Sequence, residues 1–234
     1  MRILVIAPHH DDEVLGVGGT IARHVAEGDH VCVCTVTEGL ESQFGAVGVA
    51  QVRREAQEAH QVLGIDCAVE LKLPAVHLDR VPQCELNDML AAETADADIV
   101  YLPSPVDVND DHRRVFEAGL VACRPRFESH VHTVLCYETL SETEWGASNS
   151  QRSFVPNWYV DITPFLETKL AALRCYGSQL QPSPAARSLD TVNALAVFRG
   201  HTFGVNYAEA FTLVRHTSLP FRATTDATVP GGNG

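Results

Sequence analysis

The stretch Ile3–Gly16, which reads ILVIAPHHDDEVLG, decides the fold class of this 234-residue chain. Its apolar start, rich in branched residues, predicts a buried parallel strand over Ile3–Pro8. Two histidines and three acidic residues follow at once, and an amphipathic pattern then predicts a helix from about Glu13 to Ala26. Gly28 lies where a helix-ending glycine is expected. This order of strand, polar turn and helix is typical of a βαβ unit.

The same alternation continues along the chain. It predicts further strands at Val31–Thr37, Cys67–Leu73, Ile99–Leu102, Thr133–Tyr137 and Trp158–Ile162. It predicts helices over Gln51–Leu63, Gln83–Thr94, His112–Cys123, from Thr163 or Pro164 to about Tyr176, and over Ala185–Arg199. Strands that alternate with helices pair in parallel through right-handed crossovers. We therefore expect an α/β fold, a Rossmann-like three-layer α/β/α arrangement with a mostly parallel sheet.

The length of the chain fits one domain with a large core. We expect this domain to span residues 1–222 and the glycine-rich tail, 223–234, to be disordered. The segments Gly39–Gly48 and Ser141–Pro156 are expected to be mobile loops on the rim of a site. In an open α/β sheet, that site is expected at the carboxyl edge of the strands.

Composition narrows the classes of partner and compartment. Lys plus Arg number 17 and Asp plus Glu number 30, which gives a net charge of −13. Such an acidic chain repels nucleic acid and anionic membranes. The sequence has no apolar run of the roughly 18 residues that a membrane-spanning helix needs, and its apolar start is too short for a signal peptide. We therefore expect a cytoplasmic protein.

The seven cysteines are scattered, odd in number and without a CxxC pair. This pattern predicts neither a disulfide framework nor a thiolate zinc site. Cys32 and Cys34 alternate within one predicted strand, and we expect them to be small buried hydrophobic residues on the same face.

The polar turn His9–Glu13 is the most informative part of the sequence for chemistry. Adjacent carboxylates repel one another, and a divalent cation removes that penalty. His9 and Asp12 are three residues apart across the turn, so both can bind one ion while Asp11 stays free beside it. A simpler interpretation is that Asp11 or Asp12 caps the helix. Two histidines and three acids are more than a cap requires.

A third metal ligand is expected from the segment Pro103–Arg114, which follows another predicted strand. His112 would lie at the start of the next helix, and Asp110 or Asp111 would cap that helix or orient the imidazole. Catalytic zinc sites commonly have three such protein ligands. An exposed capping loop is the alternative. Six other histidines do not stand in such a group of metal-binding residues, and we expect them to be surface or packing residues: His24, His60, His130, His132, His201 and His216.

These two segments resemble the PIG-L/LmbE family of zinc-dependent N-deacetylases, whose signature is AHPDDE followed later by DH. Pro8 and His10 depart from that signature, while the metal-binding and acidic positions match it. The resemblance implies that His9, Asp12 and His112 bind one Zn²⁺ per chain. Other divalent metals also tolerate such ligands.

The resemblance implies further roles for single residues. Asp11 resembles the general base. Other members have a histidine, thought to stabilise the oxyanion, where this chain has Asn109, and asparagine donates a hydrogen bond but supplies no proton. Arg53 lies in a match to the R-x-E-A helix, whose arginine is near the substrate pocket. Arg53 and Asn109 are therefore expected to bind substrate, although Arg53 also fits a solvated charge on a helix face.

The function implied by the resemblance is hydrolysis of an N-acetyl or other N-acyl group on an amino sugar, its glycoside or its nucleotide conjugate. The substrate would be a small molecule, and the resemblance allows a homo-oligomer. An amidase of a thiol conjugate or of another small acylated amine is one alternative. A non-catalytic module that keeps the metal is another, although such a binder needs no base like Asp11.

Overall fold

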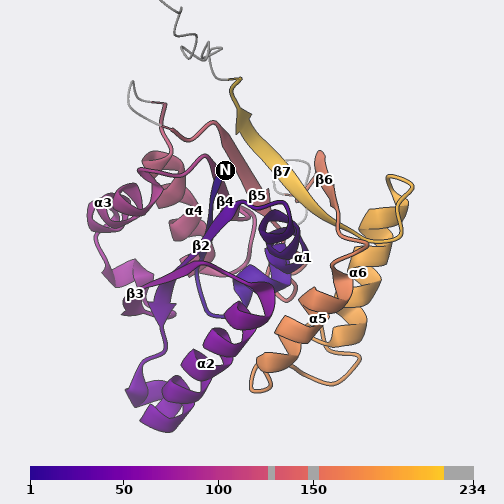
Figure 1. Cartoon of the computed structure of the whole chain (residues 1–234). Helices are drawn as coiled ribbons and strands as arrows, with labels where there is room; N and C mark the ends of the chain where they lie inside the picture. The colour runs from indigo at the N-terminus through magenta and orange to yellow at the C-terminus, as the bar shows by residue number, and fades with distance from the viewer. Residues whose placement is uncertain (126–129, 147–152, 219–234) are drawn as a thin grey trace, which may run out of the picture.

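The centre of the molecule is a twisted sheet, shown with its flanking helices in Figure 1. The computed structural model describes residues 1–125, 130–146 and 153–218. Within these residues the sheet has seven strands in the order β3-β2-β1-β4-β5-β7-β6. The first five strands in this order, β3-β2-β1-β4-β5, pair in parallel with their neighbours, and β7 is antiparallel to both β5 and β6. The strands are β1 (Arg2–Ala7), β2 (His30–Glu38), β3 (Cys67–Pro74), β4 (Ile99–Pro103), β5 (Thr133–Tyr137), β6 (Trp158–Asp161) and β7 (Ala208–His216).

Helices cover both faces of the sheet, so the expected three-layer α/β/α arrangement is confirmed. One hydrophobic core contains side chains of α1, α2, α5 and α6, and the other contains side chains of α3 and α4. Strand β1 shows why both faces must be apolar, since Ile3 and Val5 enter the first core while Leu4 and Ile6 enter the second. The helices are α1 (Asp12–Ala26), α2 (Glu41–Leu63), α3 (Gln83–Thr94), α4 (Asp110–Ala122), α5 (Leu166–Cys175) and α6 (Leu189–His201), with a short 3₁₀ helix at Leu78–Arg80.

The strand order places a crevice beside the middle of the sheet. The chain leaves β1 into α1 on one face, whereas it leaves β4 into α4 on the opposite face. Because β1 and β4 are parallel neighbours, their connections diverge at the carboxyl edge, which is where ligands bind in open α/β sheets. The turn after β1 and the loop after β4 carry the two polar segments singled out in the sequence.

A buried ion pair joins α1 to two later elements. Lys169 of α5 contacts Glu209 of β7 at 2.5 Å between Nζ and Oε1, and Lys169 also donates to the carbonyl of Leu15. The carboxylate of Glu209 accepts from the backbone N–H groups of Gly19 and Thr20 within α1. Both charges are therefore hydrogen-bonded, which a buried pair requires.

Several segments differ from the sequence prediction. Residues 41–48, expected to be a loop, belong to α2, which bends at Gly45 with φ of 72°. That left-handed backbone is accessible to glycine, so the helix continues past the bend. Helices α5 and α6 begin at Leu166 and Leu189, later than predicted, and strand β7 was not predicted. Residues 147–152 of the second expected rim loop and the tail from 219 lie outside the described residues.

The prediction that Cys32 is a small buried hydrophobic residue is wrong, because it is half-buried and disulfide-bonded. Cys32 and Cys67 form a disulfide between β2 and β3, with their Cα atoms 4.7 Å apart. The two residues are direct partners in the parallel register, a proximity that sequence spacing does not reveal. Cys34 is free and buried, as expected. No helix in the described part of the chain is long and apolar enough to cross a membrane.

Two glycines let α1 lie close to its neighbours. A Cβ atom added at Gly16 would come within 2.3 Å of the Tyr137 ring, and one at Gly19 within 2.7 Å of Ile162. Tyr137 is fully buried and its hydroxyl donates to the carbonyl of Ile6, so its ring has little room to move. This close packing explains the run of glycines after the polar turn.

We predict that Gly16→Ala lowers the free energy of unfolding by about 1–3 kcal/mol, because overpacking a filled core costs more than the gain in helix propensity. Urea denaturation followed by circular dichroism measures the change. Gly48→Ala is the matched control, since a Cβ there meets no heavy atom within 4 Å. The control is expected to be neutral or stabilising by up to about 1 kcal/mol. Equal stability of the two variants would contradict the packing argument.

Candidate metal centre

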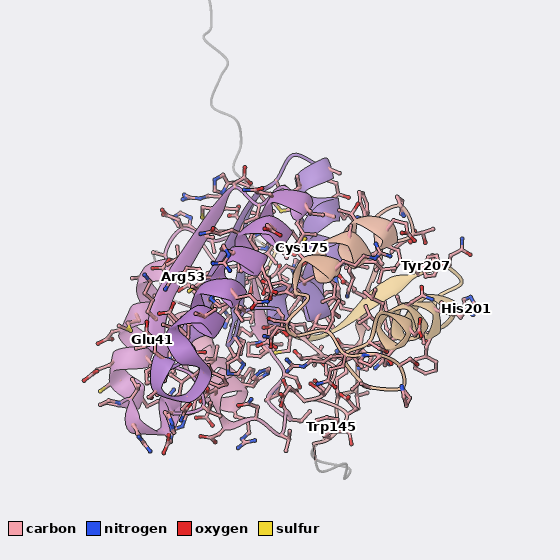
Figure 2. All side chains as sticks on the ribbon, turned by 90° about the horizontal axis from the view of Figure 1, so that it is seen from below. Glu41, Arg53, Trp145, Cys175, His201 and Tyr207 are labelled. Atoms are coloured by element: carbon pink, nitrogen blue, oxygen red, sulfur yellow. A yellow bond between two sulfur atoms is a disulfide. The ribbon has the colours of Figure 1, made fainter. Side chains whose placement is uncertain are left out.

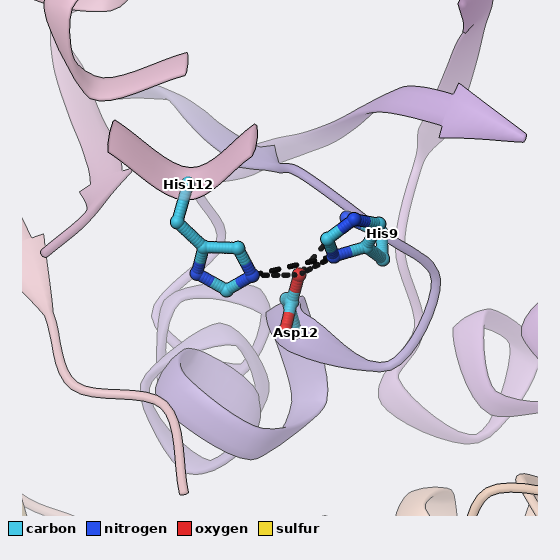
Figure 3. Close-up of side chains that lie close together, drawn as sticks. All are labelled: His9, Asp12 and His112. Atoms are coloured by element: carbon cyan, nitrogen blue, oxygen red, sulfur yellow. Dashed lines mark hydrogen bonds and ion pairs between the residues drawn. The ribbon is translucent and has the colours of Figure 1, made fainter. Parts of the chain in front are cut away.

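Three side chains from the two polar segments converge on one point, as Figure 3 shows. His9 lies in the turn after β1, Asp12 is the first residue of α1, and His112 is the third residue of α4. Asp12 Oδ2 is 3.2 Å from His9 Nδ1 and 3.2 Å from His112 Nε2. The two nitrogens are 3.3 Å apart. Asp12 and His112 are fully buried, while His9 keeps 23% of its side chain exposed and faces the open side of the site.

The outer nitrogen of each imidazole is held by a carboxylate. His112 Nδ1 lies 2.8 Å from Asp107 Oδ2, and His9 Nε2 lies 3.1 Å from Asp111 Oδ2. Asp111 also accepts from the backbone N–H groups of Val76 and Leu78, and Asp107 accepts from the hydroxyl of Thr143. Since a carboxylate accepts, these contacts place the N–H on the outer nitrogen of each ring. When each ring is neutral, its inner nitrogen presents a lone pair toward Asp12.

The arrangement fits a divalent cation. Two nitrogen lone pairs and a carboxylate oxygen in mutual contact repel unless a positive charge lies among them. Burial disfavours a charged imidazole, but the contacts with Asp111 and Asp12 raise the pKa of His9 to about 9, and Asp12 and Asp107 raise that of His112 to about 10. In addition, Asp12 Oδ1 is buried and has no hydrogen-bond partner among the described residues. Two imidazoles and one carboxylate are a donor set that zinc and related metals accept.

Asp11 lies beside these donors and contributes none of the three converging atoms. It occupies the position before α1 with φ of 94°, yet its side chain makes no capping hydrogen bond, which removes the capping interpretation. Its side chain is 2% exposed, Oδ2 accepts from Arg187 at 2.9 Å, and Oδ1 is buried without a partner in the described chain. Burial raises the pKa of Asp11 to about 8, against the opposing charge of Arg187. A carboxyl group with one unpartnered oxygen beside a metal site can accept a proton and return it.

Glu13 closes the other side of the polar turn. It is fully buried, and its Oε1 accepts from the Tyr176 hydroxyl at 2.6 Å and lies 3.2 Å from His60 Nε2. Its Oε2 accepts from the backbone N–H of Asp11, which helps to fix the unusual backbone of that residue. His60 is largely buried and has an acidic partner that the sequence did not indicate.

A cavity of about 340 Å³ opens beside the converging donors. One wall is apolar and comes from the first part of α2 and from the segment after β3. The polar part of the lining includes the segment between α5 and α6. The side chains or backbone that line it belong to His9, His10, Asp11, Thr37, Glu38, Gly39, Phe44, Gly48, Val49, Gln51, Val52, Ala75, Val76, Asn109, Ser178, Gln179 and Arg187.

The two predicted substrate-binding residues differ in position. Asn109 lines the cavity and caps α4, because its Oδ1 accepts from the backbone N–H of Asp111. The cap is thus Asn109, and Asp110 forms ion pairs on the surface with Arg113 and Arg114. Arg53, labelled on α2 in Figure 2, does not line the cavity. It pairs with Glu38 and Glu70, of which Glu38 does line the cavity. Its contact with substrate remains a prediction.

Sequence reasoning did not find Arg187 or the separate roles of Asp107 and Asp111. An ion pair between Arg187 and Asp11 joins residues 176 positions apart, and no local spacing signals it. The aspartates were visible in the segment after β4, but only the fold shows which imidazole each one contacts.

Residues 4–123, just over half of the chain, match the sequence profile of the PIG-L family, described as GlcNAc-PI de-N-acetylase. The chain belongs to the PIG-L family. All three converging donors and Asp11 lie within the matched region. The fold and the family expected from the sequence are therefore confirmed.

Relatives of this PIG-L chain cover most of its length. It is 29% identical over 187 residues to the uncharacterized deacetylase YaiS of Escherichia coli K12, which covers 75% of this chain and 90% of YaiS. The structure of N,N′-diacetylchitobiose deacetylase from Pyrococcus horikoshii superimposes with a TM-score of 0.70 and 25% identity, covering 92% of this chain and 84% of that one.

The same fold also serves another reaction. The 4-carboxy-2-hydroxymuconate hydratase GalB from Pseudomonas putida KT2440 superimposes with a TM-score of 0.74 at 20% identity, covering 95% of this chain and 99% of that one. One fold hosts several activities, so the reaction of this PIG-L protein depends on the residues at its site.

We predict that Asp107→Asn weakens binding of Zn²⁺ by about 10–100-fold, because the carboxylate that orients His112 is lost. Competition with a chromophoric chelator measures the affinity. Asp110→Asn is the matched control: it removes a neighbouring carboxylate whose partners are surface arginines, and its affinity is expected to be unchanged. If both variants bind Zn²⁺ like the wild type, Asp107 does not support the site.

We predict that metal binding releases protons at neutral pH and strengthens as the pH rises toward about 9. The raised pKa values of His9 and His112 mean that the metal-free protein holds protons that a metal must displace. Isothermal titration of Zn²⁺ in buffers of different ionisation enthalpy counts these protons. His201→Gln, which removes an exposed imidazole, is expected to leave the count unchanged. Binding without proton release at pH 7 would contradict the assignment.

Proposed function

We infer that this PIG-L protein is a zinc-dependent hydrolase that removes an N-acetyl group from an amino sugar or from its glycoside or conjugate. The observation that carries this inference is the convergence of His9, Asp12 and His112, with the carboxyl group of Asp11 buried beside them. The family description, GlcNAc-PI de-N-acetylase, and the diacetylchitobiose deacetylase among the structural neighbours support the N-acetyl amino sugar as the substrate class.

We propose that His9, Asp12 and His112 hold one Zn²⁺ per chain. Three protein ligands leave a coordination position open, as in catalytic zinc sites. When bound by these residues, zinc would supply Lewis-acid chemistry: it would lower the pKa of a bound water to about 7 and would polarise the carbonyl of the scissile amide. The buried carboxylates of Asp107 and Asp111 keep both imidazoles in the tautomer that this requires.

Asp11 is the proposed proton carrier. Its Oδ1 has no partner in the described structure and is the atom that accepts a proton from the attacking water. The leaving amine is strongly basic and must be protonated as the C–N bond breaks. The same carboxyl group then returns the proton to that nitrogen, which makes one residue both base and acid. Arg187, bound to Oδ2, favours the ionised form of Asp11 and so opposes the effect of its burial.

We propose that the cavity binds the sugar. Asn109 has its Oδ1 occupied by the cap of α4, so its amide N–H groups are available to donate to a substrate oxygen. Arg53 acts on the substrate through Glu38, its ion-pair partner, which lines the cavity. The acidic chain, with a net charge of −13, favours a neutral sugar over a polyanionic ligand. The unpartnered oxygen of Asp11 weighs against a non-catalytic binding module, which needs no proton acceptor.

We predict that the zinc-loaded protein releases acetate from N-acetylglucosamine derivatives, including N,N′-diacetylchitobiose, and that Asp11→Asn lowers kcat by about 10²–10⁴-fold because the proton carrier is lost. An enzyme-coupled acetate assay over a panel of N-acetylhexosamine conjugates, with N-acyl thiol conjugates in parallel, measures turnover. Metal analysis is expected to find about one zinc per chain in this variant, as in the wild type.

Asp12→Asn and His112→Ala are the contrasting variants, because both are expected to lose the metal together with activity. If only the thiol conjugates are cleaved, the substrate is a different acylated amine and the amino-sugar assignment is wrong. Full turnover in Asp11→Asn would refute the role of Asp11. A zinc-loaded wild type that cleaves no amide in the panel would refute the hydrolase itself.

A further inference from the structure

Arg187 reaches the polar turn from the segment between α5 and α6. Its Nη1 donates to Asp11 Oδ2 at 2.9 Å, its Nε donates to Ser141 Oγ at 2.7 Å, and its Nη2 lies 3.4 Å from Glu142 Oε1. The guanidinium therefore joins three regions of the chain: the turn after β1, the segment after β5 and its own segment before α6. Among the described residues that line the cavity, it is the sole Lys or Arg.

The backbone around Arg187 is fixed on both sides. Its carbonyl accepts from the N–H of Gln181, and the next residue, Ser188, caps α6. Earlier in the segment, the N–H and hydroxyl of Ser178 donate to Glu55 of α2 at 3.0 and 2.5 Å. These hydrogen bonds fix the backbone of the segment, so the Arg187 guanidinium has a defined position.

The carboxylate of Asp11 needs such a partner. The torsion that rotates a carboxylate plane is soft, so the side chain's own preferences do not fix its oxygens. Asp12 and Glu13 are buried next to Asp11 and repel its charge. Arg187 occupies Oδ2 and leaves Oδ1 as the oxygen without a partner in the described residues. The contact therefore decides which oxygen is available to a reacting molecule.

We propose that Arg187 is a positioning residue for the base: by holding Oδ2 of Asp11, it aims Oδ1 at the reacting water. This inference rests on the proposed function, since it assigns the base an orienting partner. The competing explanation is a purely structural one, in which Arg187 only neutralises acidic groups and ties the segment before α6 to the rest of the fold.

Arg187→Ala, Arg187→Lys and the control Arg199→Ala separate the two explanations. Arg199 lies on α6, makes two hydrogen bonds to Glu138 at 2.8 and 2.6 Å, and has 16% of its side chain exposed, so it matches Arg187 in burial and pairing. It does not line the catalytic cavity. Comparing the variants distinguishes loss of any buried arginine pair from loss of the contact with Asp11.

In Arg187→Ala we expect kcat to fall by about 10²-fold with KM changed by less than about threefold, since misplacing a catalytic group costs roughly that factor. The zinc content should stay at the wild-type level. Guanidinium chloride at millimolar concentration should restore kcat at least in part, and Arg187→Lys should retain more activity than Arg187→Ala. Arg199→Ala should keep kcat near wild type and show no response to guanidinium.

An unchanged kcat in Arg187→Ala would overturn the proposal. So would a loss that guanidinium does not relieve and that Arg199→Ala reproduces, because that pattern belongs to a structural role.

A second measurement does not depend on turnover. Melting temperatures of the wild type, Arg187→Ala, Asp11→Asn and the double variant form a cycle, and the contact predicts that the two shifts are not additive. Additive shifts would overturn the proposal whatever the activity. If the wild type cleaves no amide, the proposed function fails by itself, and the cycle still decides whether Arg187 holds Asp11.

Discussion

The repulsion among neighbouring buried carboxylates is the constraint on which the rest of the site depends. The turn after β1 places three acidic residues in succession, all of them almost fully buried. Each has its own source of positive charge or hydrogen-bond donation. Asp12 faces two imidazoles, Asp11 faces Arg187, and Glu13 faces Tyr176 and His60. Without these partners the burial of adjacent carboxylates would cost several kcal/mol for each group.

This constraint explains why so much of the molecule is involved in one turn. The partners of the turn come from α2, α4, the end of α5 and the segment before α6. Helix α1, which begins in the turn, is tied further along by the pair of Lys169 and Glu209, and its glycines allow the close approach of Tyr137 and Ile162. The position of Asp12 is thus determined by packing along the whole helix as well as by its immediate contacts.

The sequence predicted those features that have a local cause. Apolar runs, helix-ending glycines and the order of strands and helices indicated the parallel sheet, and the carboxyl edge of that sheet brought His112 to His9 and Asp12. Partners far apart in the chain were not predictable from spacing: the disulfide of Cys32 with Cys67 is one, and the pair of Arg187 with Asp11 is another. Strand β7 was missed for the same reason, since its pairing with β5 and β6 depends on tertiary contacts.

The residues around the cavity come from two separate parts of the chain, and this has an evolutionary consequence. The donors and Asp11 come from the first 112 residues, whereas Ser178, Gln179 and Arg187 come from the second half of the chain. Exchanges at Ser178 and Gln179 can therefore change which substrates fit the cavity while the metal donors, Asp11 and Arg187 stay in place. Diversification of such a scaffold is expected to concentrate around those two residues, with Arg187 and the histidines and aspartates at the sheet edge inherited unchanged.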